Sequence, residues 1–460
     1  MENYQKNILF VKVKKVFHFD KLELRLSDML ISREIMFLYP IWILFAGAPV
    51  VLLAGLLGKN RLIPPVMSFF ITASGVSILI PYLFFRQPRV IASPGGFFNF
   101  SLDAFTVAGA LCVCALCAGC IPWLASDNER PGRRAGEGFV LANLGLAVGG
   151  MLASDLMTLL LFAEASYVLF FGAARKRGSG VSDALFLAPA AAVVIGLSLF
   201  RNVAGTGGDA FLAGLPEWLP FILAGYVLYR LFFIPLSFSS DWRARIAGEP
   251  LLTLLAIISL YAEVFLMMRV LFMSPGVLRV LLPGSLAAAG IYLVIASRQR
   301  DPGKMAVCIL FIVTACITGT ACIRALVPAG GNAVAVMACS SLAAAVGLIF
   351  VTRGFDKRGG RAISVFFVVF AAALAGLLPI AGFTGRIALY RSVAGEGGYV
   401  SIVAFALLGV SLLPALLLAR FGPFVTNRFG GAVQGMSAGE ALSLGIILFS
   451  LYLPLLCYAR

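Results

Sequence analysis

The feature that most constrains this chain is a succession of apolar segments, each long enough to cross a bilayer. A membrane span needs about 20 predominantly apolar residues, and about fourteen such segments follow one another from residue 36 onward. Of the 460 residues, 61% are hydrophobic and only 12% are charged, whereas a soluble domain holds about 25% charged residues. We therefore expect an all-α polytopic membrane protein and exclude a soluble enzyme, a nucleic-acid binder and a fibrous chain.

The spans divide the chain into five parts. The expected spans are 36–57, 62–85, 103–125, 138–153, 155–174, 183–200, 217–239, 250–273, 277–296, 304–326, 331–352, 361–384, 398–420 and 439–458. The parts are a basic N-terminal extension (1–35), flanking spans one to three (36–137), two units of five spans each (138–273 and 277–420) and a last span (439–460).

The formal net charge of +15 follows the bias of Lys and Arg towards short cytoplasmic loops. Loops after odd-numbered spans are rich in basic residues, as at 175–177, whereas loops after even-numbered spans hold few. This asymmetry predicts a multi-pass protein of a bacterial or archaeal inner membrane, with both ends of the fourteen-span body facing outward. Because loop charge and the bilayer account for the basic residues, no nucleic-acid partner is expected.

Residues 1–35 do not fit this orientation, because they are rich in Lys and Arg, which resist export. They form an amphipathic arm on the cytoplasmic membrane surface, or they lie upstream of a true start at Met36, where the first span begins. We prefer the start at Met36.

Five ionisable side chains fall inside or close to the predicted spans, where a charge at mid-depth costs about 2.5 kcal/mol or more. They are Glu164 in the fifth span, Arg230 in the seventh, Glu263 and Arg269 in the eighth and Arg386 in the twelfth. Since an unpaired carboxylate in lipid is costly, Glu164 is expected to pair, with Arg230 as the nearest plausible partner. Arg269 and Arg386 need not have a functional role, because an arginine near the end of a span can extend its guanidinium to the membrane–water interface.

Two of these spans contain internal prolines, which remove a backbone hydrogen bond and kink or break a helix. Pro235 follows Arg230 in the seventh span, and Pro379 precedes Gly382 and Arg386 in the twelfth. A broken helix at membrane depth survives only where protein or water satisfies the freed backbone groups. Two such helices, five spans apart, point to an inverted-repeat transporter, and the alternative is that both prolines are ordinary kinks.

Four stretches resemble the antiporter-like subunits of respiratory complex I (the M and N types), which are related to Mrp antiporters and energy-converting hydrogenases. Residues 153–164 are similar to the family's stretch that ends in a buried glutamate, and 230–235 resemble its Lys-x-x-x-x-Pro. Residues 375–386 resemble its Gly-Leu-Pro-Pro-x-x-Gly-Phe-x-Gly-Lys, and 300–304 are a weaker match to a loop before the tenth span. The resemblance implies two inverted five-helix repeats, with broken helices in spans seven and twelve.

The resemblance also implies an ion pathway formed by Glu164, Arg230, Tyr261 and Arg386, with Glu263 beside it. The family has lysines where this chain has the two arginines, and a lysine at the central position that falls on the tyrosine. Arginine in a protein stays protonated, and tyrosine is a poor proton carrier near pH 7, so these replacements change the chemistry.

Two interpretations follow from these replacements. In the first, Glu164 and Arg230 form a permanent electrostatic clamp, while Glu263, Tyr261 and waters carry the proton. In the second, which we favour for this half-channel, the path has degenerated and the chain is a structural spacer in a complex that pumps elsewhere.

The resemblance implies a non-catalytic subunit that assembles with other membrane subunits of a respiratory, hydrogenase or antiporter complex. Such a complex moves protons or sodium ions; this chain would hold no cofactor, and any NADH or quinone would bind to partner subunits. The alternatives are an Mrp-type cation/proton antiporter subunit and a stand-alone multi-span exporter.

Cysteines in the third span have a spacing that superficially suggests metal ligands. Cys112, Cys114, Cys117 and Cys120 would spread over more than one face of a helix, so we expect them to pack between helices. His18 is the only histidine, which leaves little basis for a metal site built on imidazole.

Overall fold

The structure is a computed structural model that describes most of the apolar segments of the chain. The described residues are 38–58, 60, 62–84, 89–92, 99–102, 104–126, 136–154, 156–174, 221–222, 225–226, 228–229, 249–270, 275–326, 331–358, 361–377, 381–394, 398–421 and 438–453. The predicted span 183–200 and most of 217–239 lie outside these ranges, and so do Arg230, Pro235 and Pro379.

Helices make up nearly all of the described structure, in agreement with the predicted helical membrane fold. The elements are α4 (Tyr39–Leu57), α5 (Ile63–Leu79), η1 (Ile80–Phe84), β1 (Arg89–Ala92), β2 (Asn99–Leu102), α6 (Ala104–Ser126), α7 (Gly136–Leu152), α8 (Leu156–Ala174), α13 (Pro250–Val270), α14 (Pro275–Ser297), α15 (Pro302–Leu326), α16 (Gly331–Arg358), α17 (Arg361–Ala375), α18 (Ala381–Ala394), α19 (Gly398–Val410), α20 (Leu413–Ala419) and α22 (Ala438–Ser450). Within the described residues, seven helices are long and apolar enough to cross a membrane.

A small sheet is an addition to the predicted all-α fold. Strands β1 and β2 pair antiparallel with Arg89 opposite Leu102, and Phe100 of β2 forms an isolated bridge with Ala153 after α7. The Phe100 ring also packs edge-on against Phe162 of α8, with 5.9 Å between the ring centroids. These contacts tie the connection between α5 and α6 to the junction of α7 and α8.

Residues 300–304, the weakest of the resembling stretches, start a helix. Pro302 occupies the first position of α15, where a missing N–H costs nothing. The Asp301 side chain accepts hydrogen bonds at Oδ1 from the backbone N–H groups of Gly303 (2.7 Å) and Lys304 (3.2 Å). Asp301 is therefore the N-cap of α15.

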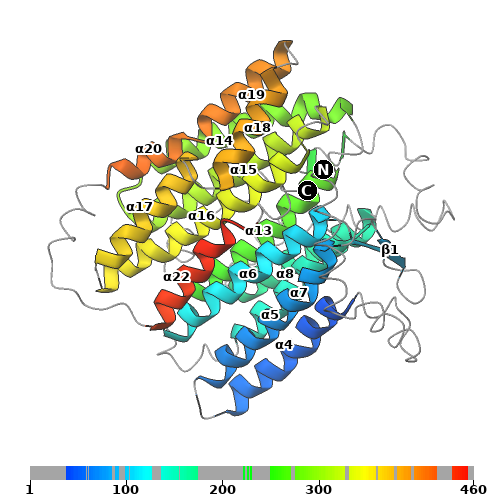
Figure 1. The fold of residues 1–460 in the computed structure, drawn as a ribbon, viewed down its shortest axis with the longest axis vertical. Helices are drawn as coiled ribbons and strands as arrows, with labels where there is room; N and C mark the ends of the chain where they lie inside the picture. The colour runs from blue at the N-terminus through cyan, green and yellow to red at the C-terminus, as the bar shows by residue number, and fades with distance from the viewer. Residues whose placement is uncertain are drawn as a thin grey trace, which may run out of the picture.

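The helices are arranged so that three of them are enclosed by the others. Helices α4 and α5 lie at one end of the bundle and α17 to α20 at the other, with α6, α13 and α16 between them (Figure 1). The apolar spans of α6, α15 and α16 are 94%, 100% and 94% buried inside the protein, whereas those of α4 and α5 are 39% and 33% buried. Helix α22, although last in sequence, packs against α6 and α16.

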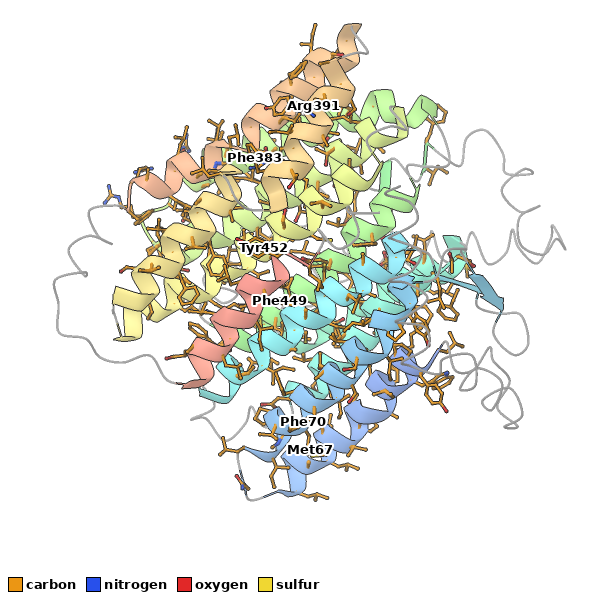
Figure 2. The ribbon with its side chains drawn as sticks, viewed as in Figure 1. Met67, Phe70, Phe383, Arg391, Phe449 and Tyr452 are labelled. Carbon is orange, nitrogen blue, oxygen red and sulfur yellow. The ribbon has the colours of Figure 1, made fainter. Side chains whose placement is uncertain are left out.

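The outer helices expose large apolar side chains. Phe70 of α5 and Phe449 of α22, both labelled in Figure 2, are 64% and 61% exposed. Apolar surface of this kind suits contact with lipid or with another membrane subunit.

The twelfth predicted span is divided into α17 and α18. The N–H of Leu377 donates to the carbonyl of Ala372, and the N–H of Gly376 donates to that of Ala373, both at 3.0 Å. Gly376 has a φ of +67°, so these two bonds form a Schellman motif that ends α17. Helix α18 then continues past residue 384, where the apolar run ends, and packs against α16.

The thirteenth predicted span is divided as well, which the sequence analysis did not anticipate. Ser411 and Leu412 form a turn between α19 and α20, and Pro414 lies in the first turn of α20. Since proline has no N–H and its ring clashes with the carbonyl four residues earlier, a continuous helix through this position is unfavourable.

Candidate ion-pathway residues in the helix bundle

Glu164 lies on α8 inside the bundle, with 7% of its surface exposed. Its expected partner Arg230 lies outside the described residues, so the pairing stays a prediction. The backbones of Glu263 and Arg269 belong to α13, but their side chains are outside the described part of the structure.

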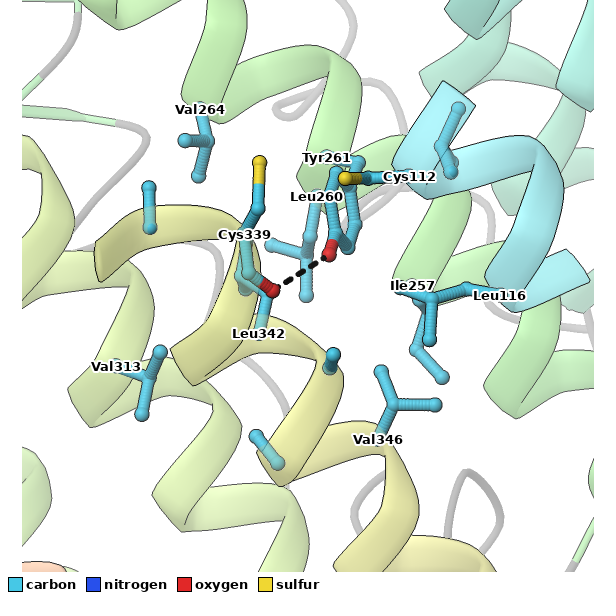
Figure 3. Packing of buried hydrophobic residues seen from close by; sticks show 14 of the residues in the cluster. Cys112, Leu116, Ile257, Leu260, Tyr261, Val264, Val313, Cys339, Leu342 and Val346 are labelled. Atoms are coloured by element: carbon cyan, nitrogen blue, oxygen red, sulfur yellow. Dashed lines mark hydrogen bonds between the residues drawn. The ribbon is translucent and has the colours of Figure 1, made fainter. Parts of the chain in front are cut away.

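Tyr261, at the expected central position, is completely buried on α13. Its hydroxyl donates a hydrogen bond to the backbone carbonyl of Cys339 on α16, at 3.3 Å (Figure 3). The side chains around it in this view are apolar or thiol groups, among them Cys112, Leu260 and Val264.

The geometry assigns Tyr261 a bridging role between α13 and α16. The proton of its hydroxyl is directed at a backbone carbonyl, which does not titrate and cannot pass a proton onward. A phenol has a reference pKa of about 10 and holds its proton near pH 7. The described contacts therefore suit a structural hydrogen bond better than a proton relay.

A buried polar network, which the sequence analysis missed, joins α7, α8 and α13. Asn143 donates through Nδ2 to the Leu255 carbonyl (3.1 Å) and to Ser259 Oγ (3.2 Å). Ser166 donates to Asn143 Oδ1 at 2.6 Å, and its hydroxyl lies 3.1 Å from that of Ser259. Ser259 also donates to the backbone carbonyl of Ser166 at 3.2 Å. A polar triplet in three apolar spans was visible in the sequence, but only the fold brings it together.

This network holds helices together and does not carry protons by itself. Both N–H groups of the Asn143 amide are engaged, and an amide neither gains nor loses a proton near pH 7. Interhelical bonds of this kind contribute about 0.6 kcal/mol each in membrane proteins.

Two further charged residues lie near the ends of α7 and α16. Glu137, in the first turn of α7, is 2% exposed, and the adjacent Gly136 backbone lies so close to Leu251 that a Cβ there would collide with it. Arg353 of α16 donates from Nη2 to Thr253 Oγ1. Both residues lie just outside the predicted spans 138–153 and 331–352, because α7 begins before its apolar run and α16 ends after its own.

Arg386 is buried within α18, with 5% of its surface exposed, and does not extend to the surface of the chain. Its guanidinium packs against the Gly376 backbone, where an added Cβ would collide with Nη1. Gly382, expected to mark a break, lies within the first turn of α18.

The cysteines of the third span are all part of the hydrophobic core. Cys112, Cys114, Cys117 and Cys120 are each at most 1% exposed on α6. The same helix contains Gly109, where a Cβ would collide with the Phe265 ring of α13. Small side chains along α6 therefore allow close helix contacts.

The fold has a clear counterpart in solved membrane complexes, although no family model and no curated protein matches the sequence. A chain of the Mrp complex from Dietzia sp. is similar with a TM-score of 0.71 and 18% identity, over 92% of this chain and 95% of that chain. A chain of the membrane-bound sulfane sulfur reductase, an archaeal respiratory membrane complex, is similar with a TM-score of 0.70 and 16% identity, over 88% and 74%.

A chain of respiratory complex I from Thermus thermophilus is also similar, with a TM-score of 0.66 and 17% identity, over 91% of this chain and 97% of that chain. All three solved structures are membrane complexes. The chain is therefore a multi-pass membrane protein with the fold of these complex-forming chains.

Proposed function

We propose that the chain is an antiporter-like membrane subunit of a multi-subunit complex that translocates protons or sodium ions, of the complex I or membrane-bound hydrogenase kind. The observation that carries this proposal is a fold shared over about nine-tenths of the chain with chains of a respiratory complex, a reductase complex and an Mrp complex. The buried side chains of Glu164 and Arg386 support this proposal. Ionisable residues inside a membrane protein are costly to bury and commonly belong to an ion or proton pathway.

The finer architecture belongs to the same proposal. The body consists of fourteen spans, with inverted repeats at 138–273 and 277–420 and both ends facing outward from a bacterial or archaeal inner membrane. The chain holds no cofactor, and redox chemistry takes place on partner subunits.

Within this function, the first five-span unit acts as a structural spacer more than as a channel. Tyr261 is bonded to a backbone carbonyl, and the Asn143 network is closed on itself. Glu164 is a buried carboxylate of this unit that is suited to respond to an ion or to a partner subunit. The contacts thus support a structural role for this half, with translocation elsewhere in the complex.

The second candidate function is a subunit of an Mrp-type cation/proton antiporter. The structural similarity to the Mrp-complex chain favours this candidate, because the match has a TM-score of 0.71 and covers 95% of that chain. Sodium-dependent proton flux without redox partners distinguishes it from the first candidate.

The experiment that separates a structural spacer from a conducting path is proton pumping by the assembled complex carrying Glu164→Gln. We expect the pumping rate to stay within about twofold of the wild type, because a structural spacer needs no titration at this position. Glu440→Gln is the matched control, since Glu440 is a buried carboxylate on α22, away from the expected path. Abolished pumping with intact assembly in the Glu164 variant, but not in the control, contradicts the structural-spacer interpretation.

A further inference from the structure

Four basic side chains gather where α14 ends, α15 begins and α20 ends. Arg298 and Arg300 lie in the short connection between α14 and α15, and Lys304 lies in the first turn of α15. Arg420 directly follows α20 and donates from Nη1 to the backbone carbonyl of Ser297, the last residue of α14, at 2.6 Å. This bond joins two segments that are 123 positions apart, and the four side chains form what we call the basic cluster.

The chain around the basic cluster supplies little negative charge. Asp301 is the one carboxylate in residues 297–304 and 416–421, and its Oδ1 accepts the two backbone bonds that cap α15. Residues 422–437, which continue the sequence from α20, contain no Asp or Glu. Four cations against one carboxylate leave a formal excess of three positive charges on these segments. The three arginines of the cluster are exposed, so this charge is available to a ligand.

Exposed apolar side chains lie on the same two helices, on the membrane side of the basic cluster. The apolar spans end at Ser297 and at Ala419, directly before the arginines. On α14, Val294 is 53% exposed about one turn before Arg298; on α20, Leu416 is 67% exposed one turn before Arg420. Both spans are only 39% buried inside the protein, so these helices present apolar surface below a row of cations.

We propose that the basic cluster and the apolar side chains below it bind an anionic phospholipid of the surrounding bilayer. The guanidinium groups of Arg298, Arg300 and Arg420 donate charge-assisted hydrogen bonds to the phosphate of the headgroup. The acyl chains lie along Val294 of α14 and Leu416 of α20. Basic groups at the end of membrane-spanning helices are at the depth where lipid phosphates lie, so both parts of the lipid are matched.

The combination of charge and apolar surface selects this ligand over others. A free phosphate ion uses the cations and gains nothing from Val294 or Leu416. A zwitterionic phospholipid carries the same phosphate, but its own cationic group offsets the attraction to the cluster. An acidic segment of a water-soluble protein leaves the apolar side chains uncovered. The site requires that the chain spans a membrane and does not rest on the proposed ion translocation.

The first test is native mass spectrometry of the purified full chain, with any subunits that accompany it, titrated with phosphatidylglycerol at constant ionic strength. A basic residue near an anionic lipid surface changes the affinity by about fivefold. We therefore expect Arg300→Gln to raise the Kd of the tightest lipid about fivefold, and Arg298→Gln in the same chain to add about fivefold more. The control Arg391→Gln, which removes an exposed cation on α18, should leave this Kd unchanged.

Two further ligands distinguish the source of the phosphate in the same titration. Phosphatidylcholine with the same acyl chains should bind more weakly than phosphatidylglycerol, and inorganic phosphate should not displace the bound lipid. Equal affinity for the two lipids, displacement by inorganic phosphate, or an Arg300→Gln chain that binds as tightly as the wild type overturns the proposal.

The second test locates the lipid on the wild-type chain and needs no variant. Membranes that contain phosphatidylglycerol with a diazirine in its acyl chain are irradiated, and the labelled peptides are identified by mass spectrometry. We expect labelling to concentrate on the ends of α14 and α20 that contain Val294 and Leu416. Equal labelling of α4 and α5, whose spans are 39% and 33% buried and expose comparable apolar surface, contradicts a specific site. A partner subunit found cross-linked at this position in place of the lipid overturns the proposal as well.

Discussion

The polar network between α7, α8 and α13 makes a quantitative prediction for Asn143→Leu, which keeps the approximate volume and removes the amide. Three hydrogen bonds are lost, to Leu255 O, Ser259 Oγ and Ser166 Oγ. At about 0.6 kcal/mol for each interhelical bond, the total is about 2 kcal/mol. The two serine hydroxyls lie 3.1 Å apart and can still bond to each other, so we expect a loss of about 1–2 kcal/mol.

The assay is reversible unfolding of the chain by SDS in mixed micelles, read by far-UV circular dichroism. Ser77→Ala serves as the control, because its hydroxyl bonds only to the Ala73 carbonyl of its own helix and should leave the unfolding free energy unchanged. A double-mutant cycle of Asn143→Leu with Ser259→Ala should give a coupling energy of about 0.6 kcal/mol. Strictly additive effects, or an Asn143 variant as stable as the wild type, refute the reasoning.

Three further variants test other contacts by the same unfolding assay. Gly109→Ala should destabilise the chain by about 1–3 kcal/mol, because its Cβ collides with the Phe265 ring, and Phe265→Leu in the same chain should restore part of the loss. Asp301→Ala should cost about 1 kcal/mol through loss of the α15 N-cap, whereas Asp301→Asn should retain most of the stability; equal losses contradict the cap. Tyr261→Phe removes one bond to the Cys339 carbonyl and should leave ion translocation by the complex unchanged; abolished translocation assigns the hydroxyl a role in the path.

The sequence predicts the described helices well because each of them coincides with a largely continuous run of apolar residues. The run 39–57 in α4, the run 104–126 in α6 and the start of α17 at Arg361 all lie within a few residues of the expected spans. The interruption of the twelfth span could also be anticipated, since Gly376 and Pro379 disrupt a helix by backbone chemistry alone.

The parts that the sequence could not predict depend on contacts between distant residues. Asn143 and Ser259 are 116 positions apart, and nothing local indicates that they meet. Arg386 lies beyond the apolar run of its span, so a hydropathy pattern ends the helix before it, yet α18 continues past it and its side chain is buried against Gly376. The β1–β2 hairpin is equally invisible to the apolar pattern, because Phe100 is ordered by Ala153 and Phe162 from other elements.

The central claim, that this chain is a subunit of an ion-translocating complex, is tested most directly by purifying the tagged chain in mild detergent and identifying its companions by mass spectrometry. The account predicts stoichiometric membrane subunits together with proteins that carry iron–sulfur, flavin or nickel–iron centres. If the companions are small membrane proteins without redox centres, the result supports the alternative function, an Mrp-type antiporter subunit. A chain that purifies alone and monodisperse contradicts the claim and points to a stand-alone exporter.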